Sequence, residues 1–508
     1  MSSTRSVEPS VARLPEGAMQ GEPAHPGDLK GIAVPGVRWT GLAQVARLSL
    51  QFLTTLLFAW LLDPADFGLV GMAAVVVGFV ALFKDLGTGA ALVQGDEPDA
   101  DVLSTVFWAN VGIGLLAGGL LFAGGPWLAE LYREPRLTGV VRVLAIALPL
   151  SGPAVVPLSL LQRHLRFATI ARVETTAHAA GAVAGVASAL VGAGLWSLVI
   201  HALVVAGLQS ALALLACGGV PTGFFRPRLL RGVASYGAGL TGFQVTHWLT
   251  RNVDQLLLGR VFGATALGYY VLACRLVLQP LQAATGVVAR VMFPLYSRIQ
   301  DDHARLRHAY LRVAPALATV LFPALAGLAV ISGPFVDSFF GEKWSAAAPI
   351  ITLMATAGFL IVIGTSVGVI YQATGRTDLL LRWGLLAAVV TITAYGVGLA
   401  WGPLGVAAGF LVAILVLAYP GLAIPLRLIG LRAGSVFAVL MRPALATLVM
   451  AGATLLFGWA LQGRVAPAVQ LAAMIAFGVV VYLGTSLWIN GQRTRELLAL
   501  VVRRSPDR

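Results

Sequence analysis

The chain has few charged residues, few lysines and only two cysteines. Charged residues make up 11% of its 508 residues, and the mean hydropathy is +0.85. Soluble domains carry about 25% charged residues, so a soluble globular protein is excluded and a membrane protein is expected. Basic residues outnumber acidic ones by 35 to 22, but they gather in loops on one side of the predicted membrane, which argues against nucleic-acid binding.

Cysteine and histidine form no pattern that would bind a metal or a cofactor. Cys217 and Cys274 lie in separate apolar stretches, far from the CxxC and Cys/His spacings of metal sites and redox motifs. The seven histidines contain no HExxH pair. We therefore expect no disulfide, no metal and no cofactor.

Long apolar runs predict an all-α integral membrane protein with about fourteen transmembrane helices. A run of about 18–25 apolar residues is long enough to span a bilayer as a helix. The predicted spans are 38–62, 67–83, 102–123, 138–161, 173–192, 195–217, 234–262, 266–292, 309–332, 346–372, 379–400, 403–427, 441–462 and 467–489. Pro149, Pro153 and Pro157 are expected to kink the fourth span.

Charge in the loops predicts the orientation. If the N-terminus is inside, the inner segments and their helix ends carry about 25 Lys and Arg, and the outer loops about five. This asymmetry places both termini in the cytoplasm of a multi-pass protein in a bacterial inner membrane. Residues 1–36, rich in Pro, Gly, Ser and Glu, are predicted to form a disordered cytoplasmic tail and not a signal peptide.

Two of the apolar stretches carry the same polar stripe. Steps of three and four residues place such side chains on one face of a helix. The first stripe holds Gln44, Arg47, Gln51, Thr54 and Thr55, and the second holds Gln244, His247, Arg251, Asp254 and Gln255. An arginine near the centre of a membrane helix costs roughly 2.5–3.5 kcal/mol on insertion scales. Such a stripe in both copies predicts a hydrated cavity between two related half-molecules.

Further matches suggest an internal repeat. LLDPADFG (61–68) aligns with VFGATALG (261–268), and Gln162 and Arg166 match Gln372 and Arg376 at an offset of 210. Both halves begin inside, so an axis along the membrane normal would relate them. The predicted parts are a tail (1–36), a six-helix lobe (37–217), a cytoplasmic inter-lobe linker (218–233), a second six-helix lobe (234–430), an extra helix pair (441–489) and a cytoplasmic tail (490–508).

Plainer interpretations of these polar residues stay open. Arg47 lies close enough to the inner end of its helix to reach the interface, and Gln and Thr can join helices by ordinary hydrogen bonds. We expect the matched pairs Gln162/Arg166 and Gln372/Arg376 to have a structural or lipid-facing role in preference to a direct role in transport.

Six motifs in order carry a resemblance to a known family. They are LLDPADFG followed by KDLGTGAALVQ, LLQRHLRF (160–167), RNVDQLLLGRVFGATALGYY (251–270), VMFPLYSRIQDD (291–302), GEKWSAAAPIITLM (341–354) and YQATGRTDLLLRW (371–383). From about residue 36 to 430 the chain resembles the polysaccharide-transport branch of the multidrug/oligosaccharidyl-lipid/polysaccharide exporter superfamily. Within that branch it is similar to the O-antigen, colanic-acid and teichuronic-acid flippases.

The resemblance implies a function and a partner. It implies a flippase, not an enzyme, that moves polyprenyl-diphosphate-linked oligosaccharide from the cytoplasmic to the outer leaflet for exopolysaccharide or lipopolysaccharide assembly. Alternating access coupled to an ion gradient, and cooperation with a polymerase and other assembly proteins, are further expectations from the family.

Arginine in the second half is the expected binding group for the diphosphate. Its planar fork makes bidentate, charge-assisted hydrogen bonds to phosphate. Arg251 and Arg275 are the main candidates, and Arg47 and Arg290 are further candidates. Asp254 would hold Arg251 in place until cargo or a proton arrives; a structural Arg251–Asp254 salt bridge is the alternative. The other candidates for lining the cavity are Gln51, Gln244, His247 and Gln279.

Few groups could couple transport to an ion. Asp254 is one candidate, and Glu174 with His178, four residues on, is another. An interfacial ion pair of Glu174 with nearby Arg172 is the plainer expectation.

Two rival functions deserve comparison. A multidrug–cation antiporter of the same superfamily would favour an acidic or aromatic cavity, whereas the intramembrane charges here are mostly arginine. A membrane polysaccharide polymerase or ligase would need a large outer loop, and the longest one, GGPWLAELYREPR, is short. No nucleophile–base pair or phosphate loop appears in the sequence.

Overall fold

The computed structural model describes residues 46–85, 87–94, 98–300, 302–364 and 367–502. Every regular element in these ranges is an α-helix or a short 3-10 helix. The all-helical fold predicted from the apolar runs is therefore confirmed for the described residues.

The helices divide into two compact units, which are described separately. Unit 1 comprises the chain up to Leu62 and Leu69–Asn252, and unit 2 comprises Asp63–Gly68 and Val253 onward. Two helices contribute to both units: α2 (Pro64–Asp85) and α10 (Pro227–Arg298).

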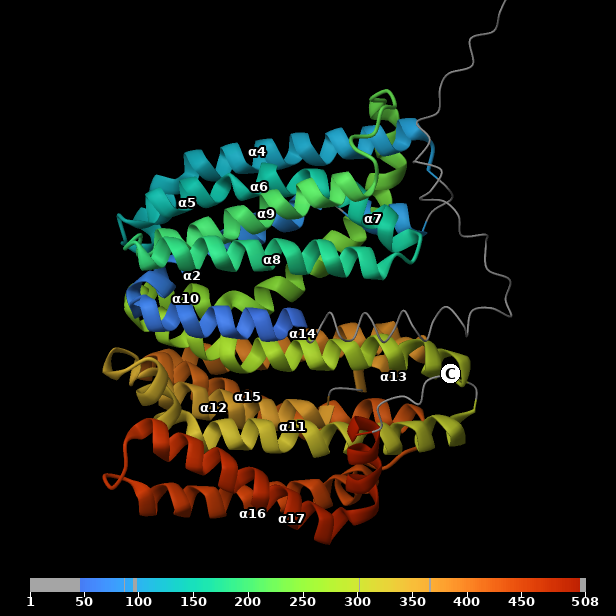
Figure 1. Ribbon diagram of the computed structural model, residues 1–508. Coiled ribbons are helices and arrows are strands. Elements are labelled where there is room, and N and C mark those ends of the chain that lie inside the picture. The colour runs from blue at the N-terminus through green and yellow to red at the C-terminus, as the bar shows by residue number, and fades with distance from the viewer. Residues whose placement is uncertain (1–45, 86, 95–97, 301, 365–366, 503–508) are drawn as a thin grey trace, which may run out of the picture. The chain divides into compact units, whose positions relative to one another are not determined.

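Unit 1 holds a bundle of long and broken helices. Its further elements are a helix Ala46–Leu61, α3 (Thr88–Gln94), α4 (Ala100–Tyr132), α5 (Leu137–Ala145), α6 (Ala147–Ser151), η2 (Gly152–Ala154), α7 (Val155–Arg163), α8 (Phe167–Leu190) and α9 (Trp196–Ala216). Within it, α4 packs on α5 and α6, and α9 packs on α6 and α8 (Figure 1). The segment from α5 to α7 is interrupted at Ile146 and at the 3-10 turn η2, which contains Pro153, while Pro149 and Pro157 lie inside α6 and α7. The helix is thus irregular at the prolines, and the kink expected of this span stays a prediction.

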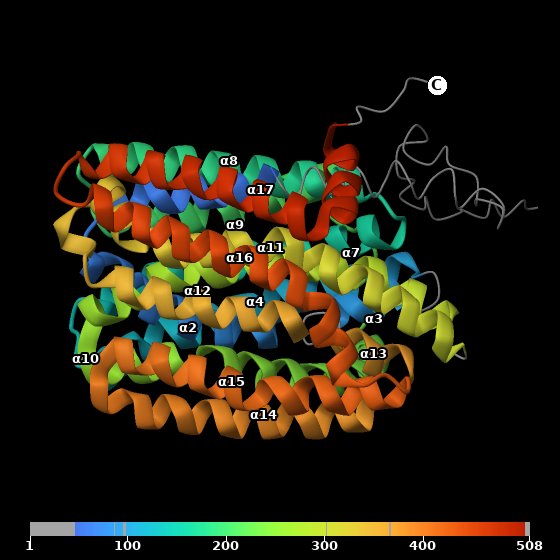
Figure 2. The same cartoon turned by 90° about the horizontal axis from the view of Figure 1, so that it is seen from below.

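Unit 2 holds the remaining helices. Its further elements are α11 (His303–Phe339), η3 (Glu342–Trp344), α12 (Ala347–Gly364), α13 (Val367–Ala373), α14 (Thr377–Gly398), η4 (Leu399–Trp401), α15 (Gly402–Leu428), α16 (Ala433–Leu461) and α17 (Pro467–Val502). α14 runs beside α15, and α16 runs beside α11 and α17 (Figure 2).

Ten helical ranges of the described chain are long and apolar enough to span a membrane. One of them, 244–286, is broken at Gly263, and another, 378–428, is broken at η4. The helix Ala46–Leu61 is shorter than the rest, and α8 is not among the ten. The chain is thus a multi-pass membrane protein, and the number fourteen stays a prediction.

The sequence repeat is visible in two turns of the backbone. α7 leads into α8 through Leu165 (φ 55°) and Arg166, and α13 leads into α14 through Gly375 (φ 69°) and Arg376. The Arg166 amide donates to the Leu161 carbonyl at 2.8 Å, and the Arg376 amide donates to the Tyr371 carbonyl at 2.9 Å. Both turns therefore have one conformation, as the offset of 210 residues predicts.

The segment Asp63–Gly68, which consists of Asp63 and the first five residues of α2, belongs to unit 2. Phe67 is fully buried with its ring edge-on to Trp344 at 5.2 Å between centroids. Nζ of Lys343 lies 3.3 Å from Oδ1 of Asp63. Residues from the start of the chain are thus part of the core of unit 2, which no periodicity in the sequence indicates.

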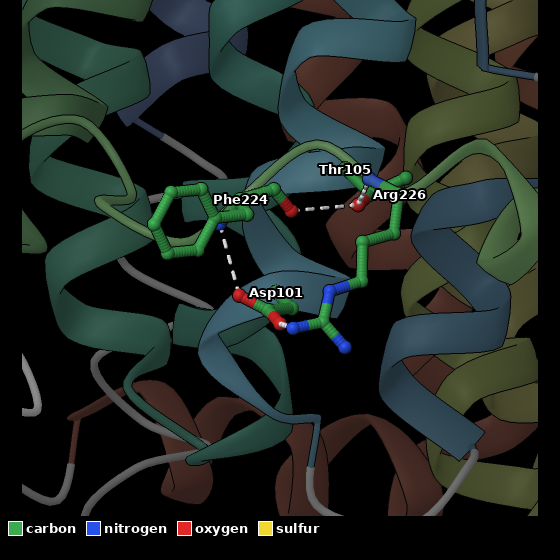
Figure 3. A network of polar contacts seen from close by, with 4 residues as sticks. All are labelled: Asp101, Thr105, Phe224 and Arg226. Atoms are coloured by element: carbon green, nitrogen blue, oxygen red, sulfur yellow. Dashed lines mark hydrogen bonds and ion pairs between the residues drawn. The ribbon is translucent and has the colours of Figure 1, made fainter. Parts of the chain in front are cut away.

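The segment that joins α9 to α10 is fastened to α4 inside unit 1. Asp101 accepts a hydrogen bond from the Phe224 amide at 2.9 Å and pairs with the Arg226 guanidinium at 2.8 Å. One turn on, Thr105 accepts from the Arg226 amide at 2.9 Å and donates to the Phe224 carbonyl at 3.3 Å (Figure 3). A Cβ on Gly223 would overlap the Ala100 carbonyl oxygen. We call this set of contacts the α4 clasp.

Candidate functional site

The arginine of the first polar stripe is paired with an acid from α8. Nη1 of Arg47 lies 2.7 Å from Oε2 of Glu174, and each side chain is 29% exposed. The pairing neutralises both charges within an apolar part of unit 1, where an unpaired charge is costly. An anionic ligand could bind Arg47 only by sharing it with Glu174 or replacing it.

Glu174 therefore pairs with Arg47 and not with Arg172, the partner expected from the sequence. Arg172 instead donates to the Ala168 carbonyl and the Thr169 hydroxyl, both at 3.4 Å. Residues two apart on a helix point in different directions, so Glu174 and Arg172 do not face each other. His178 lies half-buried one turn beyond Glu174 on α8, where the charges of Arg47 and Glu174 both act on it.

Gln44 of the first stripe lies outside the described residues, and the other members make helix-internal bonds or are exposed. Thr54 and Thr55 are buried, and their hydroxyls donate to the carbonyls of Leu50 and Gln51 four residues back. Such bonds satisfy the hydroxyl within its own helix and leave no donor for a ligand. The Gln51 side chain is exposed.

A buried carboxylate lies in unit 2 where α10 folds back on itself. Asp254 is 4% exposed, its Oδ2 accepts from the Tyr270 hydroxyl at 2.6 Å, and its Oδ1 accepts from the Gln255 amide at 2.8 Å. In a straight helix these sixteen residues would span about 24 Å. The contact exists because Gly263 breaks the helix with φ 78° and ψ −171°, a conformation that glycine adopts without strain.

Asp254 contacts Tyr270 and the Gln255 amide, whereas the sequence predicted a contact with Arg251. Both oxygens of the Asp254 carboxylate accept from groups other than Arg251, and the Arg251 side chain is exposed. Arg251 is thus open to an external partner, while Asp254 is held inside unit 2 by Tyr270, which is 1% exposed.

Arg275 is held over an aromatic ring. Its guanidinium carbon lies 5.5 Å from the centroid of the Phe67 ring, within the range of a cation–π interaction. It makes no ion pair with a carboxylate in the part of the chain that the structure describes. A cation stabilised by a ring keeps its hydrogen-bond donors for an anion, so Arg275 suits a phosphate ligand.

The remaining predicted residues lie in less enclosed positions. Gln244 is half-buried and Gln279 is exposed. The side chains of His247 and Arg290 lie outside the described residues. The structure thus brings the candidates together as three groups: Arg47 with Glu174, Asp254 with Tyr270, and Arg275 with Phe67.

Metal and disulfide chemistry find no support among the described side chains. No group of three or more His, Cys, Asp or Glu residues there is placed to hold a metal ion. Both thiols are free. Sγ of Cys274 lies 3.9 Å from Sδ of Met354, and Sγ of Cys217 lies 3.5 Å from the Pro157 carbonyl oxygen.

Sequence reasoning missed several residues that build these groups. Tyr270 and Phe67 each lie inside a quoted motif, RNVDQLLLGRVFGATALGYY and LLDPADFG, but a motif alone does not say which residues meet. Asp101 lies at the end of the acidic inner segment QGDEPDAD, which carries little weight in the charge rule.

Comparison with known proteins places these features in a family. The model of a family described as "Polysaccharide biosynthesis protein" matches residues 57–349. The teichuronic acid biosynthesis protein TuaB of Bacillus subtilis is 30% identical over 88% of this chain and 94% of its own. The lipopolysaccharide biosynthesis protein WzxC of Escherichia coli is 28% identical over 75% and 78%. The succinoglycan biosynthesis transport protein ExoT of Rhizobium meliloti is 28% identical over 71% and 73%.

Solved structures share the fold. The lipid II flippase MurJ in an inward closed conformation matches 90% of this chain and 99% of its own, with a TM-score of 0.70 and 15% identity. An inward-facing multidrug resistance transporter of the MATE family, in the MOP superfamily, matches 76% and 98%, with a TM-score of 0.62 and 16% identity. The helical fold is therefore that of MurJ and the MATE transporters.

Proposed function

The chain belongs to the family of polysaccharide biosynthesis proteins, and on that basis we propose that it is a flippase for lipid-linked oligosaccharides. Its cargo is a polyprenyl-diphosphate-linked oligosaccharide, moved from the cytoplasmic to the outer leaflet for exopolysaccharide or lipopolysaccharide assembly. The observation that carries the proposal is the likeness to proteins named for exported polysaccharides along most of their length.

The physical chemistry of such a cargo agrees with the composition of the helices. A diphosphate and many sugar hydroxyls cannot cross hydrocarbon unaided, because desolvating charge costs tens of kcal/mol in the Born limit. A path lined by arginine and amide side chains replaces the lost water, while the polyprenyl chain stays in the lipid. The arginines and glutamines of the two stripes supply such a lining within otherwise apolar helices.

We assign the diphosphate to arginines that pair with no carboxylate among the described residues. Arg251 is exposed, and Arg275 rests on the Phe67 ring without a described carboxylate. Arg290 and Arg47 would assist, the latter in exchange for Glu174. The glycan would contact Gln51, Gln244, His247 and Gln279. Arg251→Ala and Arg275→Ala should abolish flipping without loss of protein, whereas Arg251→Lys should restore it in part because lysine cannot bind bidentately.

Coupling to an ion gradient would require a carboxylate that lies within the membrane-spanning part of the protein and can take up and release a proton. Asp254 is buried and bound by Tyr270, so a change in its protonation would alter the packing of both halves of α10. Glu174 with His178 is the second candidate, and its ion pair with Arg47 makes a structural role the plainer one. If Asp254→Asn and Glu174→Gln both leave transport dependent on the proton gradient, neither residue carries the coupling.

The proposed topology has both termini in the cytoplasm of the bacterial inner membrane and about fourteen spans. Two six-helix lobes, 37–217 and 234–430, would rock about the linker 218–233 to open the path to either side in turn. The matching turns at Leu165–Arg166 and Gly375–Arg376 support this repeat. A polysaccharide polymerase is the proposed downstream partner, since it consumes the cargo on the outer face.

The decisive test is the fate of the lipid-linked glycan after the gene is deleted. Glycolipid extraction with a sidedness assay should find polyprenyl-diphosphate oligosaccharide accumulating on the cytoplasmic face. The same lipid on the outer face would contradict flipping and indicate polymerisation.

A drug–cation antiporter is the second candidate, because the MATE fold is shared. Failure to accumulate the glycolipid together with new sensitivity to cationic drugs would favour it.

A further inference from the structure

A small polar pocket opens among helix ends of unit 2, apart from the groups assigned above. It has a volume of about 420 Å³ and is lined by Gln300, His303, Thr374, Arg376 and Leu428. These residues come from the end of α10, the start of α11, the turn between α13 and α14, and the end of α15. Ligand pockets commonly measure about 300–1,000 Å³, so this one can hold a phosphate group and part of its neighbour.

The backbone fixes the position of the arginine in this pocket. Gly375 adopts φ 69°, which turns the chain sharply, and Arg376 follows as the N-cap of α14. Nε of Arg376 donates to Oδ1 of Asp378 at 3.2 Å. That bond orients the guanidinium plane, and its two Nη groups have no partner among the described residues. They are the donors that bind phosphate bidentately.

Two described acids lie near the pocket: Asp378 pairs with Nε of Arg376, and Asp302 is engaged at the start of α11. Asp302 accepts from the amides of Ala304 and Arg305 and pairs with the Arg305 side chain at 3.1 Å. The Arg305 amide is the main reason that the pKa of Asp302 lies below its usual value. Asp302 therefore caps α11 as an anion and is compensated there, while His303 and Gln300 beside it are exposed.

The charge pattern places this pocket at the inner membrane surface. The segments that line it, 293–308 and 373–378, are inner loops by the distribution of Lys and Arg. Phosphate-bearing headgroups of the inner leaflet lie at that level, and Leu428 adds an apolar group to the lining.

We propose that this pocket is a binding site for a lipid-borne phosphate at the cytoplasmic surface, with Arg376 as its main ligand. His303 and Gln300 complete the donor set, whereas the Thr374 hydroxyl lines the pocket but already donates to the Ile370 carbonyl at 2.8 Å. Two sources share this chemistry: the diphosphate of the cargo, an assignment that rests on the proposed flippase function, and the headgroup of an anionic phospholipid. A docking place at the inner surface would hold the headgroup before it enters the transmembrane path.

Protection of an introduced thiol tests the site directly. In the full chain carrying Gln300→Cys and Cys217→Ser, maleimide labelling is read site by site by peptide mass spectrometry, first in neutral detergent. Farnesyl diphosphate at about ten times its half-protecting concentration should slow labelling at position 300 by about tenfold, because protection follows occupancy of the site, and farnesol should not. Adding Arg376→Gln should remove the protection, whereas Arg432→Gln should keep it, since Arg432 is an exposed arginine outside the pocket.

The same protein in vesicles separates the two sources. Protection in phosphatidylcholine vesicles that contain phosphatidylglycerol, with no diphosphate added, would identify the phospholipid headgroup. Protection only on adding farnesyl diphosphate would identify the cargo type. Unchanged labelling with both probes, or equal protection in the Arg376→Gln and Arg432→Gln variants, would overturn the proposal. None of these readouts depends on flipping, so the proposed function can fail or stand separately.

Discussion

Gly68 and Gly268, two hundred residues apart, make reciprocal contacts inside unit 2. A Cβ on Gly68 would overlap the carbonyl oxygen of Ala264, and a Cβ on Gly268 would overlap the carbonyl oxygen of Pro64. Pro64 and Ala264 are also two hundred residues apart. Gly68 therefore packs on Ala264, the counterpart of Pro64, and Gly268, the counterpart of Gly68, packs on Pro64. Self-complementary contact of this kind is the mark of a local two-fold relation, and it supports the proposed pairing of the lobes.

Alanine at either glycine should prevent close packing of the two helix starts. Because the obstacle is backbone and cannot rotate away, Gly68→Ala and Gly268→Ala should each cost at least about 3 kcal/mol, the upper end for overpacking. Gly112→Ala is the matched control, since nothing lies within 4 Å of its added Cβ. Thermal unfolding in detergent and the yield of monodisperse protein measure the effect. Wild-type behaviour of both variants would contradict the contact.

The α4 clasp should depend more on its hydroxyl than on its ion pair. Thr105→Val removes the buried hydroxyl that accepts from the Arg226 amide and should cost about 1–3 kcal/mol. Arg226→Ala removes only an ion pair whose arginine is 62% exposed, so the loss should stay below about 1 kcal/mol. Thr356→Val is the control, because its exposed hydroxyl bonds only within its own helix. Chemical denaturation ranks the three, and the opposite order would sink this account.

Exchange of charges separates the two roles of Arg47. Arg47→Gln and Glu174→Gln should each destabilise unit 1, since each leaves a partly buried charge without its partner. The double variant Arg47→Glu/Glu174→Arg should recover thermal stability. If Arg47 also binds diphosphate, the double variant should remain defective in flipping; full recovery of flipping would make the pair structural only.

Tyr270→Phe tests the link between the two halves of α10. The phenol donates to Asp254 at 2.6 Å, and its loss should impair transport as much as Asp254→Asn if the pair acts as a unit. Tyr371→Phe, at another buried tyrosine of unit 2, is the comparison, because its hydroxyl has no hydrogen-bond partner among the described residues. Flipping by each variant is measured against an imposed proton gradient in vesicles. Additive defects of Tyr270→Phe and Asp254→Asn in the double variant would show that they act independently.

A covalent bridge between positions 63 and 343 should not impair flipping. Asp63 and Lys343 lie within salt-bridge distance in unit 2, and Phe67 is buried beside them. If the segment Asp63–Gly68 moves with unit 2, a short bis-maleimide between Asp63→Cys and Lys343→Cys should form in high yield and preserve flipping. A bridge that forms and stops flipping would show that this contact opens during transport.

Most helices could be predicted from the sequence, because apolar length and proline act locally. The irregular span 138–161 and the break at Gly263 follow from residues whose backbone restraints do not depend on the rest of the fold. The repeated turn before Arg166 and Arg376 was visible for the same reason, as one local pattern that occurs twice.

Partners of the charged residues could not be predicted in the same way. Glu174 lies two residues from Arg172 but pairs with Arg47, 127 residues away. Asp254 meets Tyr270 only because the chain reverses between them, and Arg275 meets the ring of a residue from the start of the chain. Spacing along one helix selects a face, whereas the identity of what lies opposite depends on tertiary packing.

The contacts of the segment Asp63–Gly68 also constrain the order in which the protein can fold during synthesis. The partner Lys343 follows Asp63 by 280 residues, and at about 5–20 residues per second the ribosome needs roughly 14–56 s to deliver it. Until then Phe67 has no Trp344 to pack against, although α4 and the segment that clasps it are already complete. The packing of Phe67 against Trp344 therefore forms only after α4 and the segment that clasps it have been synthesised.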